Sequence, residues 1–174
     1  MRLPPALRRL ALAVHVICSV GWIGAAAAYL ALGLAAQFSR RGQLVRAAWL
    51  AMELTGWYVI VPLGCLAFLT GLVMALGTPW GLLRHYWVLI AFTFTSFALV
   101  ILILHMPSVT EMARLAAQAD DATAVRLGGD VLHPAVGLLV LVFVAVLNIY
   151  KPRGLTGFGQ PTRSRLPEPA EKDN

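Results

Sequence analysis

Charged residues are scarce in this 174-residue chain, and their absence is concentrated in four places. Only 13% of the residues are charged, against about 25% in an ordinary soluble domain. Asp, Glu, Lys and Arg are all missing from four stretches, which are 10–38, 54–76, 86–106 and 131–150. Each stretch exceeds or matches the roughly 20 apolar residues that a helix needs to cross a bilayer. These absences exclude a soluble globular fold and predict an integral membrane protein surrounded by lipid.

Several kinds of site are also missing. The only two cysteines, Cys18 and Cys65, lie far apart within apolar stretches, which excludes a disulfide framework or a zinc knuckle. The sequence has no phosphate-binding loop, no GxSxG elbow and no HExxH motif. The net charge of +6 comes from basic residues near the predicted helix ends. They indicate membrane topology and contact with lipid headgroups, not binding of nucleic acid.

The hydropathy pattern predicts an all-α fold, an integral membrane four-helix bundle formed by residues 1–152. The helices should cover about 9–36, 46–76, 86–106 and 133–150. Two prolines predict irregularities in them. Pro62 should kink the second helix and free the carbonyl of Tyr58, and the third helix should end before Pro107 because the residue preceding proline disfavours helix.

The connecting segments carry weaker signals. Residues 108–128 place apolar residues at helical spacing between charged ones, which predicts a short amphipathic helix on the membrane surface. Asp130 or His133 should cap the fourth helix, with Pro134 in its first turn. Residues 153–174 are rich in proline, glycine and charge, and predict a disordered polar tail.

The positions of the basic residues predict the orientation. The first apolar stretch is about twice as long as the 7–15 residues of a signal-peptide core, so we expect it to be retained as a helix. Four spans place both termini on one side. With the N-terminus inside, nine basic residues lie inside and five outside. The positive-inside rule therefore predicts that both termini are cytoplasmic.

Polar residues at membrane depth are the candidate functional residues. Five residues of the first helix, four of them polar or aromatic, recur at helical spacing and so share one face; they are His15, Ser19, Trp22, Ala26 and Tyr29. We expect this face to point into the bundle, where His15 either binds a cofactor or only bonds a neighbouring helix. His85 begins the third helix at the same membrane level, as a second cofactor ligand or as part of an interfacial aromatic belt.

A second group of candidates lies at the opposite end of the bundle. His105 ends the third helix and His133 begins the fourth, so antiparallel packing puts the two imidazoles at one level, and Glu53 enters from the same end. Imidazole and carboxylate groups suit haem iron, copper or zinc. The alternative is that the histidines are capping or interfacial residues and that Glu53 pairs with Arg46 or Arg126.

Several segments of the sequence resemble those of a known bacterial family. The resemblance is carried by the segments His15-Val-Ile-Cys-Ser-Val-Gly-Trp-Ile-Gly, Trp80-Gly-Leu-Leu-Arg-His-Tyr-Trp-Val and Leu104-His-Met. The family consists of predicted integral membrane proteins of unknown function, which implies the inner (plasma) membrane of a bacterium. That family is similar to the copper-resistance protein D family, implicated in copper uptake, and to the HemJ-type protoporphyrinogen oxidase, a four-helix protein that binds haem b.

The resemblance to the HemJ type is partial. Those proteins carry a His early in the first helix followed by a Trp and a Gly, and His15, Trp22 and Gly24 are similar. They also carry a Lys early in the third helix, where Ala91 stands in this sequence. The missing Lys argues against protoporphyrinogen oxidation, whereas haem binding through His15 and His85 is still implied.

Three functions follow from these observations. The leading hypothesis is a membrane protein that binds haem b or a transition metal and that has redox activity. Its cofactor ligands would be His15, His85, His105 and His133, and its metal ligands Glu53, His105 and His133. The second is a copper carrier that also uses Cys18 and Met74. The third is a non-catalytic subunit with structural histidines and no cofactor, in a homo-oligomer or with a membrane partner.

Overall fold

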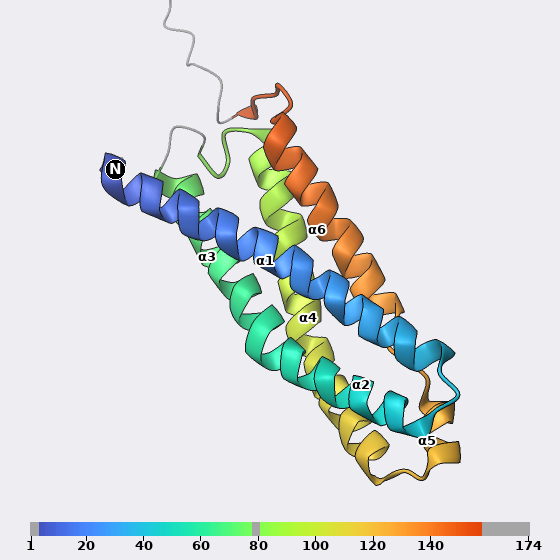
Figure 1. Cartoon of the computed structure of the whole chain (residues 1–174). Helices are drawn as coiled ribbons and strands as arrows, with labels where there is room; N and C mark the ends of the chain where they lie inside the picture. The colour runs from blue at the N-terminus through green and yellow to red at the C-terminus, as the bar shows by residue number, and fades with distance from the viewer. Residues whose placement is uncertain (1–3, 78–80, 158–174) are drawn as a thin grey trace, which may run out of the picture.

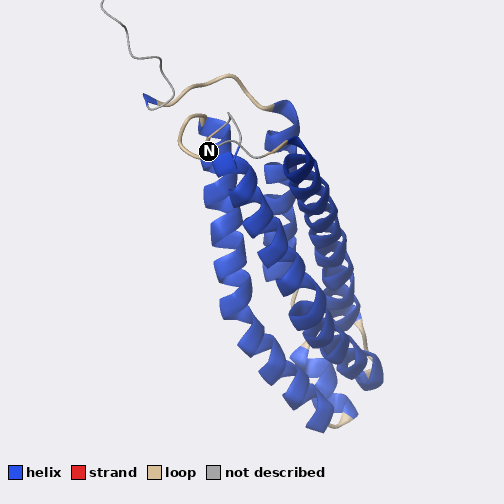
Figure 2. Cartoon of the chain, turned by 90° about the vertical axis from the view of Figure 1, so that its left-hand side faces the viewer, coloured by secondary structure: helices blue, strands red, loops and turns tan. Residues whose placement is uncertain are grey.

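The computed structural model describes residues 4–77 and 81–157, and helices dominate both ranges. The elements are α1 (Pro5–Phe38), α2 (Gly42–Thr55), the π-helical segment η1 (Gly56–Ile60), α3 (Val61–Gly77), α4 (Tyr86–Gln118), α5 (Asp121–Leu127) and α6 (Leu132–Tyr150). They form a bundle in which α2, η1 and α3 follow one another as a single rod (Figures 1 and 2). Four helical stretches are long and apolar enough to cross a membrane, so the predicted four-helix membrane fold is confirmed.

The second rod departs from a regular α-helix directly before Pro62. It begins at Gly42 rather than near 46, and its π-helical segment ends with the N–H of Val61 bonded to the carbonyl of Gly56. A proline cannot donate to the carbonyl four residues back, and a wider turn re-forms the pairing around it. A Cβ on Gly56 would lie 2.5 Å from Cε of Met106, so this glycine lets α4 approach closely.

The third rod is longer than the sequence predicted. α4 passes through Pro107 and ends at Gln118, so the predicted end at residue 106 is wrong. The predicted surface helix over 108–128 is instead divided between the end of α4 and α5. Pro107 removes the bond to the carbonyl of Ile103, but residues beyond it, such as Val109 at 1% exposure, are buried against α2. Tertiary packing here outweighs the local cost of the proline.

The fourth rod begins without the predicted cap. Val131 is the N-cap of α6 and makes no side-chain capping bond, so the prediction that Asp130 or His133 caps this helix is wrong. Their side chains bond each other instead. The prediction failed because a tertiary partner on α4 competes for the same carboxylate, as described below.

The beginning of the predicted tail is ordered. Tyr86 donates its backbone N–H to the carbonyl of Gly154, and Thr156 donates its own to the carbonyl of Arg84. Thr156 is also buried. The predicted disorder from residue 153 is therefore wrong for this short segment, because it satisfies backbone groups at the start of α4. Residues 158–174 lie outside the described residues.

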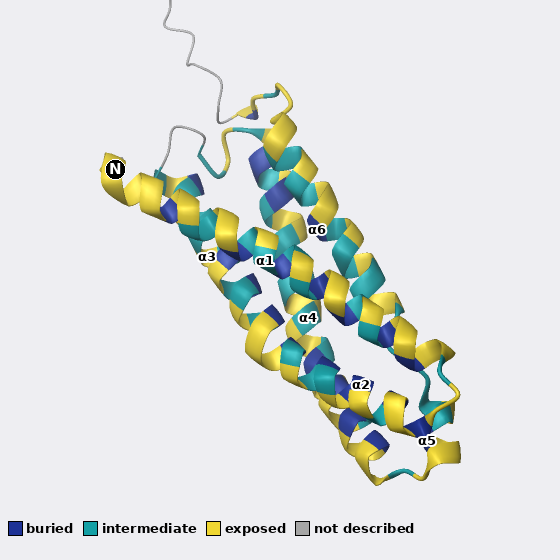
Figure 3. Ribbon diagram, viewed as in Figure 1, coloured by how far each residue is buried: buried dark blue, intermediate teal, exposed yellow. Residues whose placement is uncertain are grey.

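Close packing is concentrated at the end of the bundle that holds α5. We call this part the cap: it consists of α2, the portion of α4 after Pro107, and α5. The largest fully buried side chains in the described chain lie in the cap or next to it, and they are Val45, Met52, Met106 and Val109. In contrast, α6 has a single buried residue, Leu141. Figure 3 shows α6 as mainly intermediate and exposed along its length.

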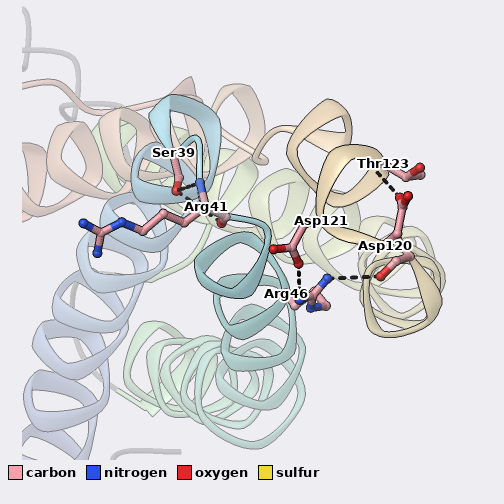
Figure 4. A network of polar contacts seen from close by, with 7 residues as sticks. Ser39, Arg41, Arg46, Asp120, Asp121 and Thr123 are labelled. Carbon is pink, nitrogen blue, oxygen red and sulfur yellow. Dashed lines mark hydrogen bonds and ion pairs between the residues drawn. The ribbon is translucent and has the colours of Figure 1, made fainter.

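Polar contacts fasten α5 to α2 within the cap. Arg46 donates from Nη2 to Oδ1 of Asp121 at 2.5 Å and from Nη1 to the carbonyl of Ala119 at 3.1 Å (Figure 4). A Cβ on Gly42 would lie 2.5 Å from Cα of Asp121, so the two helices meet backbone to backbone. These contacts fix the position of the segment that leads into α6.

Candidate functional site

Three side chains converge between the middle of α4 and the start of α6. Nε2 of His105 lies 2.7 Å from Oδ2 of Asp130, and Nδ1 of His133 lies 3.3 Å from Oδ1. The two imidazole rings stack with their centroids 3.7 Å apart and their planes inclined by 19°. The predicted neighbourhood of His105 and His133 is thus confirmed, and a carboxylate that the sequence assigned to helix capping lies beside both.

The carboxylate at the centre is shielded from the surroundings. The side chain of Asp130 is 8% exposed, that of His105 20% and that of His133 48%. A buried carboxylate is stable only when its oxygens accept several hydrogen bonds or bind a cation. Asp130 accepts from both imidazoles and from the hydroxyl of Tyr29 on α1 at 3.4 Å. Three rods therefore share one charged group.

The loop that carries Asp130 is held by backbone contacts with α1. A Cβ on Gly33 would lie 1.9 Å from the carbonyl oxygen of Asp130, and a Cβ on Gly129 would lie 1.9 Å from the carbonyl oxygen of Gly33. Only glycine fits at both positions. Gln37 on α1 accepts a bond from the N–H of Gly129 at 2.9 Å, and Trp49 on α2 donates to the carbonyl of Gly128 at 2.9 Å.

The site lies about one membrane thickness along α4 from the start of this helix. The 20 residues of α4 from Tyr86 to His105 advance about 30 Å along the helix, which is the thickness of the hydrocarbon core. Gly56, the first residue of the π-helical segment, packs against Met106, which lies between His105 and Pro107 on α4. Irregular backbone at membrane depth is tolerated where protein buries it or a cavity adjoins it.

An apolar cavity of about 590 Å³ adjoins the three side chains. α1, α4 and α6 supply nearly all of its lining, which includes His105, Asp130 and His133. The aromatic side chains of Trp22, Tyr29, Phe94 and Phe97 also line it. The site therefore combines a polar end with a roomy apolar chamber.

The predicted polar face of the first helix does point into the bundle. Trp22 and Tyr29 are 4% and 6% exposed, and His15 and Ser19 are half-buried. Nδ1 of His15 lies 2.9 Å from the carbonyl of Ala67, so its ring fastens α1 to α3. The cavity does not extend to His15. This geometry matches the structural role that the sequence left open for this histidine.

The other two candidates lie apart from the cluster. His85 is the N-cap of α4, about 30 Å along this helix from His105, and its ring lies 6.4 Å from that of Trp87. Glu53 is half-buried on α2 in the cap. The three-residue group with convergent ligand atoms contains His105, Asp130 and His133 but not Glu53. The structure thus brings together two of the predicted residues and replaces Glu53 by Asp130.

Sequence reasoning missed Asp130 and Tyr29 as members of the site. Asp130 lies three residues before His133, a spacing that places two side chains on the same side of a helix start. It also follows Gly128-Gly129, which indicates that backbone approaches closely there. Those two signals could have identified the acid. Nothing in the sequence pairs Tyr29 with a residue 101 positions away.

Comparisons of the chain with protein-family models, with curated proteins and with solved structures found no match. What the site does is therefore decided by the chemistry of its residues.

Proposed function

We propose that this membrane protein binds a first-row transition-metal ion through His105, Asp130 and His133. One observation carries the proposal: each residue offers a ligand atom, and these atoms all lie within 4.8 Å of one another. The ligands come from two helices and from a loop fixed against α1 by glycine contacts. Neutral imidazole and carboxylate groups are ligands that zinc, copper and iron share.

Binding would require a small rearrangement of the cluster. Tetrahedral zinc with bonds of 2.0–2.1 Å places neighbouring ligand atoms roughly 3.3 Å apart, which is closer than the outer limit of 4.8 Å in this cluster. The two imidazole rings also stack face to face, whereas two rings bound to one ion each point an edge nitrogen at it, so one imidazole would turn out of the stack. His133 is the ring that can turn, because its side chain is the more exposed of the two.

Haem b fits these residues less well than a single ion. A haem held between two histidines needs a gap for the macrocycle, and rings stacked at 3.7 Å leave none. The cavity beside His105 and His133 does not extend to His15, so it offers no room for a macrocycle at that histidine. A copper-carrying path would also use Cys18, and the group of convergent His, Cys, Asp and Glu side chains in the described residues does not include it.

The orientation that accompanies the proposal follows from the basic residues. With both termini in the cytoplasm of a bacterium, the cap and the metal cluster face outward from the plasma membrane. Reporter fusions placed after residues 41 and 121 should then both report the outer side, since these positions lie at the starts of α2 and α5, at the end of the bundle that holds the cap. Cytoplasmic signals from both fusions would reverse the orientation.

Metal content of the purified protein tests the proposal. The full-length chain in detergent is dialysed against Zn²⁺ or Cu²⁺ and analysed by inductively coupled plasma mass spectrometry. We expect one ion per chain, lost in His105→Ala and in His133→Ala but retained in the control His15→Ala. We also expect no Soret band after expression with ample haem. Equal metal content in all four proteins would show that the histidines are structural.

A further inference from the structure

The cavity beside the metal cluster has a composition that differs from one end to the other. Its polar groups gather at the end formed by Tyr29, His105, Asp130 and His133. The remaining wall consists of apolar and aromatic side chains, among them Trp22, Phe94 and Phe97. Its volume of about 590 Å³ lies within the range of roughly 300–1,000 Å³ that ligand pockets occupy. The cavity therefore suits a molecule with a small polar head and a large apolar body.

The polar end can exchange hydrogen bonds with a neutral oxygen. His133 uses Nδ1 to bond Asp130, and among the described residues its Nε2 has no partner. With its Nδ1–H donating to Asp130, the neutral ring of His133 accepts from a hydroxyl at Nε2, and it donates to a carbonyl there only when the ring carries both protons. The nearby carboxylate of Asp130 would repel a phosphate or a fatty-acid head. These charges favour an uncharged head over an anionic lipid.

The walls select the shape of the apolar body. Phe94 and Phe97 line the cavity, and Phe94 is held from behind by an edge-to-face contact with Phe143, their centroids 5.4 Å apart. Tyr29, the aromatic side chain of the polar end, favours a flat ring that can stack on it, and the phenylalanines suit an apolar tail. α6 forms one side of the cavity and is the least buried rod, so the chamber lies next to the lipid. A ligand dissolved in the membrane can therefore reach it without crossing water.

We propose that this cavity binds an isoprenoid quinone or quinol, with its oxygenated ring against His133 and its apolar tail along α4 and α6. This inference concerns a second ligand and does not depend on the metal. A quinone carries a flat ring, neutral oxygens that can accept or donate as carbonyl or hydroxyl, and a long apolar tail.

Two glycines provide a matched pair of variants for the test. Gly137 lines the cavity on α6, and a Cβ at this position would meet nothing within 4 Å. Gly137→Leu therefore fills the chamber without forcing the backbone apart. Gly24 on α1 is equally open to a Cβ but does not line the cavity, so Gly24→Leu is the control. Val136→Phe, at a half-exposed position of the wall, is a second filling variant.

The experiment measures binding of decylubiquinone to the full-length chain in phosphatidylcholine nanodiscs that contain EDTA. EDTA removes metal, so failure of this inference is separate from failure of the metal proposal. We expect one site per chain, weakened about ten-fold or more in Gly137→Leu and in Val136→Phe because the new side chain takes the space of the ring. Gly24→Leu should bind as the wild type does, and circular dichroism should show the same helix content in all variants.

A second probe tests the polar end. Decylbenzene keeps a ring and the tail but has no oxygen, so we expect it to bind about ten-fold more weakly than decylubiquinone. His133→Ala should weaken decylubiquinone and leave decylbenzene unchanged. Equal binding of the two probes would show that the cavity only collects apolar molecules, and unimpaired binding in both filling variants would place the ligand elsewhere. If phosphatidylglycerol displaces bound decylbenzene and decylubiquinone does not, the occupant of the cavity is a phospholipid. Each of these three results overturns the inference.

Discussion

The cap and α6 are built in opposite ways, although both lie next to the cluster of His105, Asp130 and His133. In the cap, the side chains of Val45 and Met52 are completely buried, as are Ala113 and Ala116 on the facing surface of α4. In α6, only Leu141 is buried. The cap also carries charged residues on its outside, whereas α6 carries none. The difference is that between a packed core and a lipid-facing helix.

The contrast has a physical origin. Apolar side chains in the cap are removed from water, so their burial is driven by the hydrophobic effect. Lipid tails are as apolar as leucine, so α6 gains nothing comparable by packing closely. α6 is therefore free to stand away from its neighbours and leave a chamber. The cluster of His105, Asp130 and His133 lies between the cap and α6. The loop before α6 is bonded to Trp49 of the cap, whereas the ring of His133 on α6 is about half-exposed.

Truncation of core side chains should show the largest difference between the regions. Met52→Ala removes a fully buried side chain from the cap and should lower the free energy of unfolding by about 3–4 kcal/mol, as in other large-to-small core changes. Leu139→Ala on α6, where the side chain is 71% exposed, should change it by less than about 0.5 kcal/mol. Unfolding in mixed detergent and sodium dodecyl sulfate, followed by circular dichroism, measures both. Equal losses would remove the distinction between cap and α6.

The join between the two regions is the next most sensitive point. Gly33→Ala places a Cβ 1.9 Å from the carbonyl oxygen of Asp130, and the resulting backbone shift should cost about 2–3 kcal/mol. It should also displace Asp130 and weaken metal binding. Gly24→Ala, which meets nothing within 4 Å, is the control for an added methyl on the same helix. Retention of both stability and metal by Gly33→Ala would show that the loop adapts.

The sequence was sufficient for the rods but not for the cap. Apolar runs of about 20 residues identified all four spans, because a bilayer imposes that length on any helix that crosses it. No comparable external constraint sets the lengths of the helices in the cap. Pro107 locally signals a helix end, and only the burial of Val109 and Ala113 against α2 explains why α4 continues. Local propensity failed where tertiary packing decided the outcome.

The site was likewise only half predictable. The neighbourhood of His105 and His133 follows from antiparallel connectivity, since both lie at the ends of apolar runs that meet at one level. The choice of Asp130 over Glu53 does not follow, because it depends on how the loop before α6 folds back on Gly33. A carboxylate in a loop can face several ways, and no periodicity records which one.

Electrostatic contacts within the cap should have a smaller effect. Arg46→Ala removes the ion pair with Asp121 and the bond to the carbonyl of Ala119, and should cost about 1 kcal/mol because this side chain is partly shielded from solvent. Arg114→Ala breaks an exposed pair with Glu111 and should have less effect. The same unfolding titration at low and high salt measures both. A larger loss for Arg114→Ala would contradict the assignment of Arg46 as the link between α2 and α5.

The smallest effect concerns the short helix α5 and depends on pH. Asp120 caps α5 by accepting a bond from the N–H of Thr123 at 2.9 Å. Hydrogen bonds from the side chain and the backbone of Thr123 hold the pKa of Asp120 below its ordinary value of 3.8. Because the pKa is lower in the folded state, the stabilising contribution is complete above the unfolded value. It is lost as the pH falls through the folded one.

Amide hydrogen exchange of α5 checks this prediction. Corrected for intrinsic rates, the protection of residues 121–127 should be constant at neutral and mildly acidic pH. It should fall below about pH 3.8 as the carboxylate of Asp120 becomes protonated. In Asp120→Ala, protection should be reduced at neutral pH and should not change further on acidification. An acid response that persists in this variant would assign the effect to another carboxylate.

The central claim is that His105 and His133 hold one metal ion, and pulsed electron paramagnetic resonance of the Cu²⁺-loaded protein tests it most directly. Electron spin echo envelope modulation counts the imidazole rings bound to the copper. The account predicts two rings in the wild type and one ring in either His105→Ala or His133→Ala wherever copper is retained, with the spectrum of His15→Ala identical to that of the wild type. A wild-type spectrum without imidazole coupling, or one that neither cluster variant changes, would contradict it.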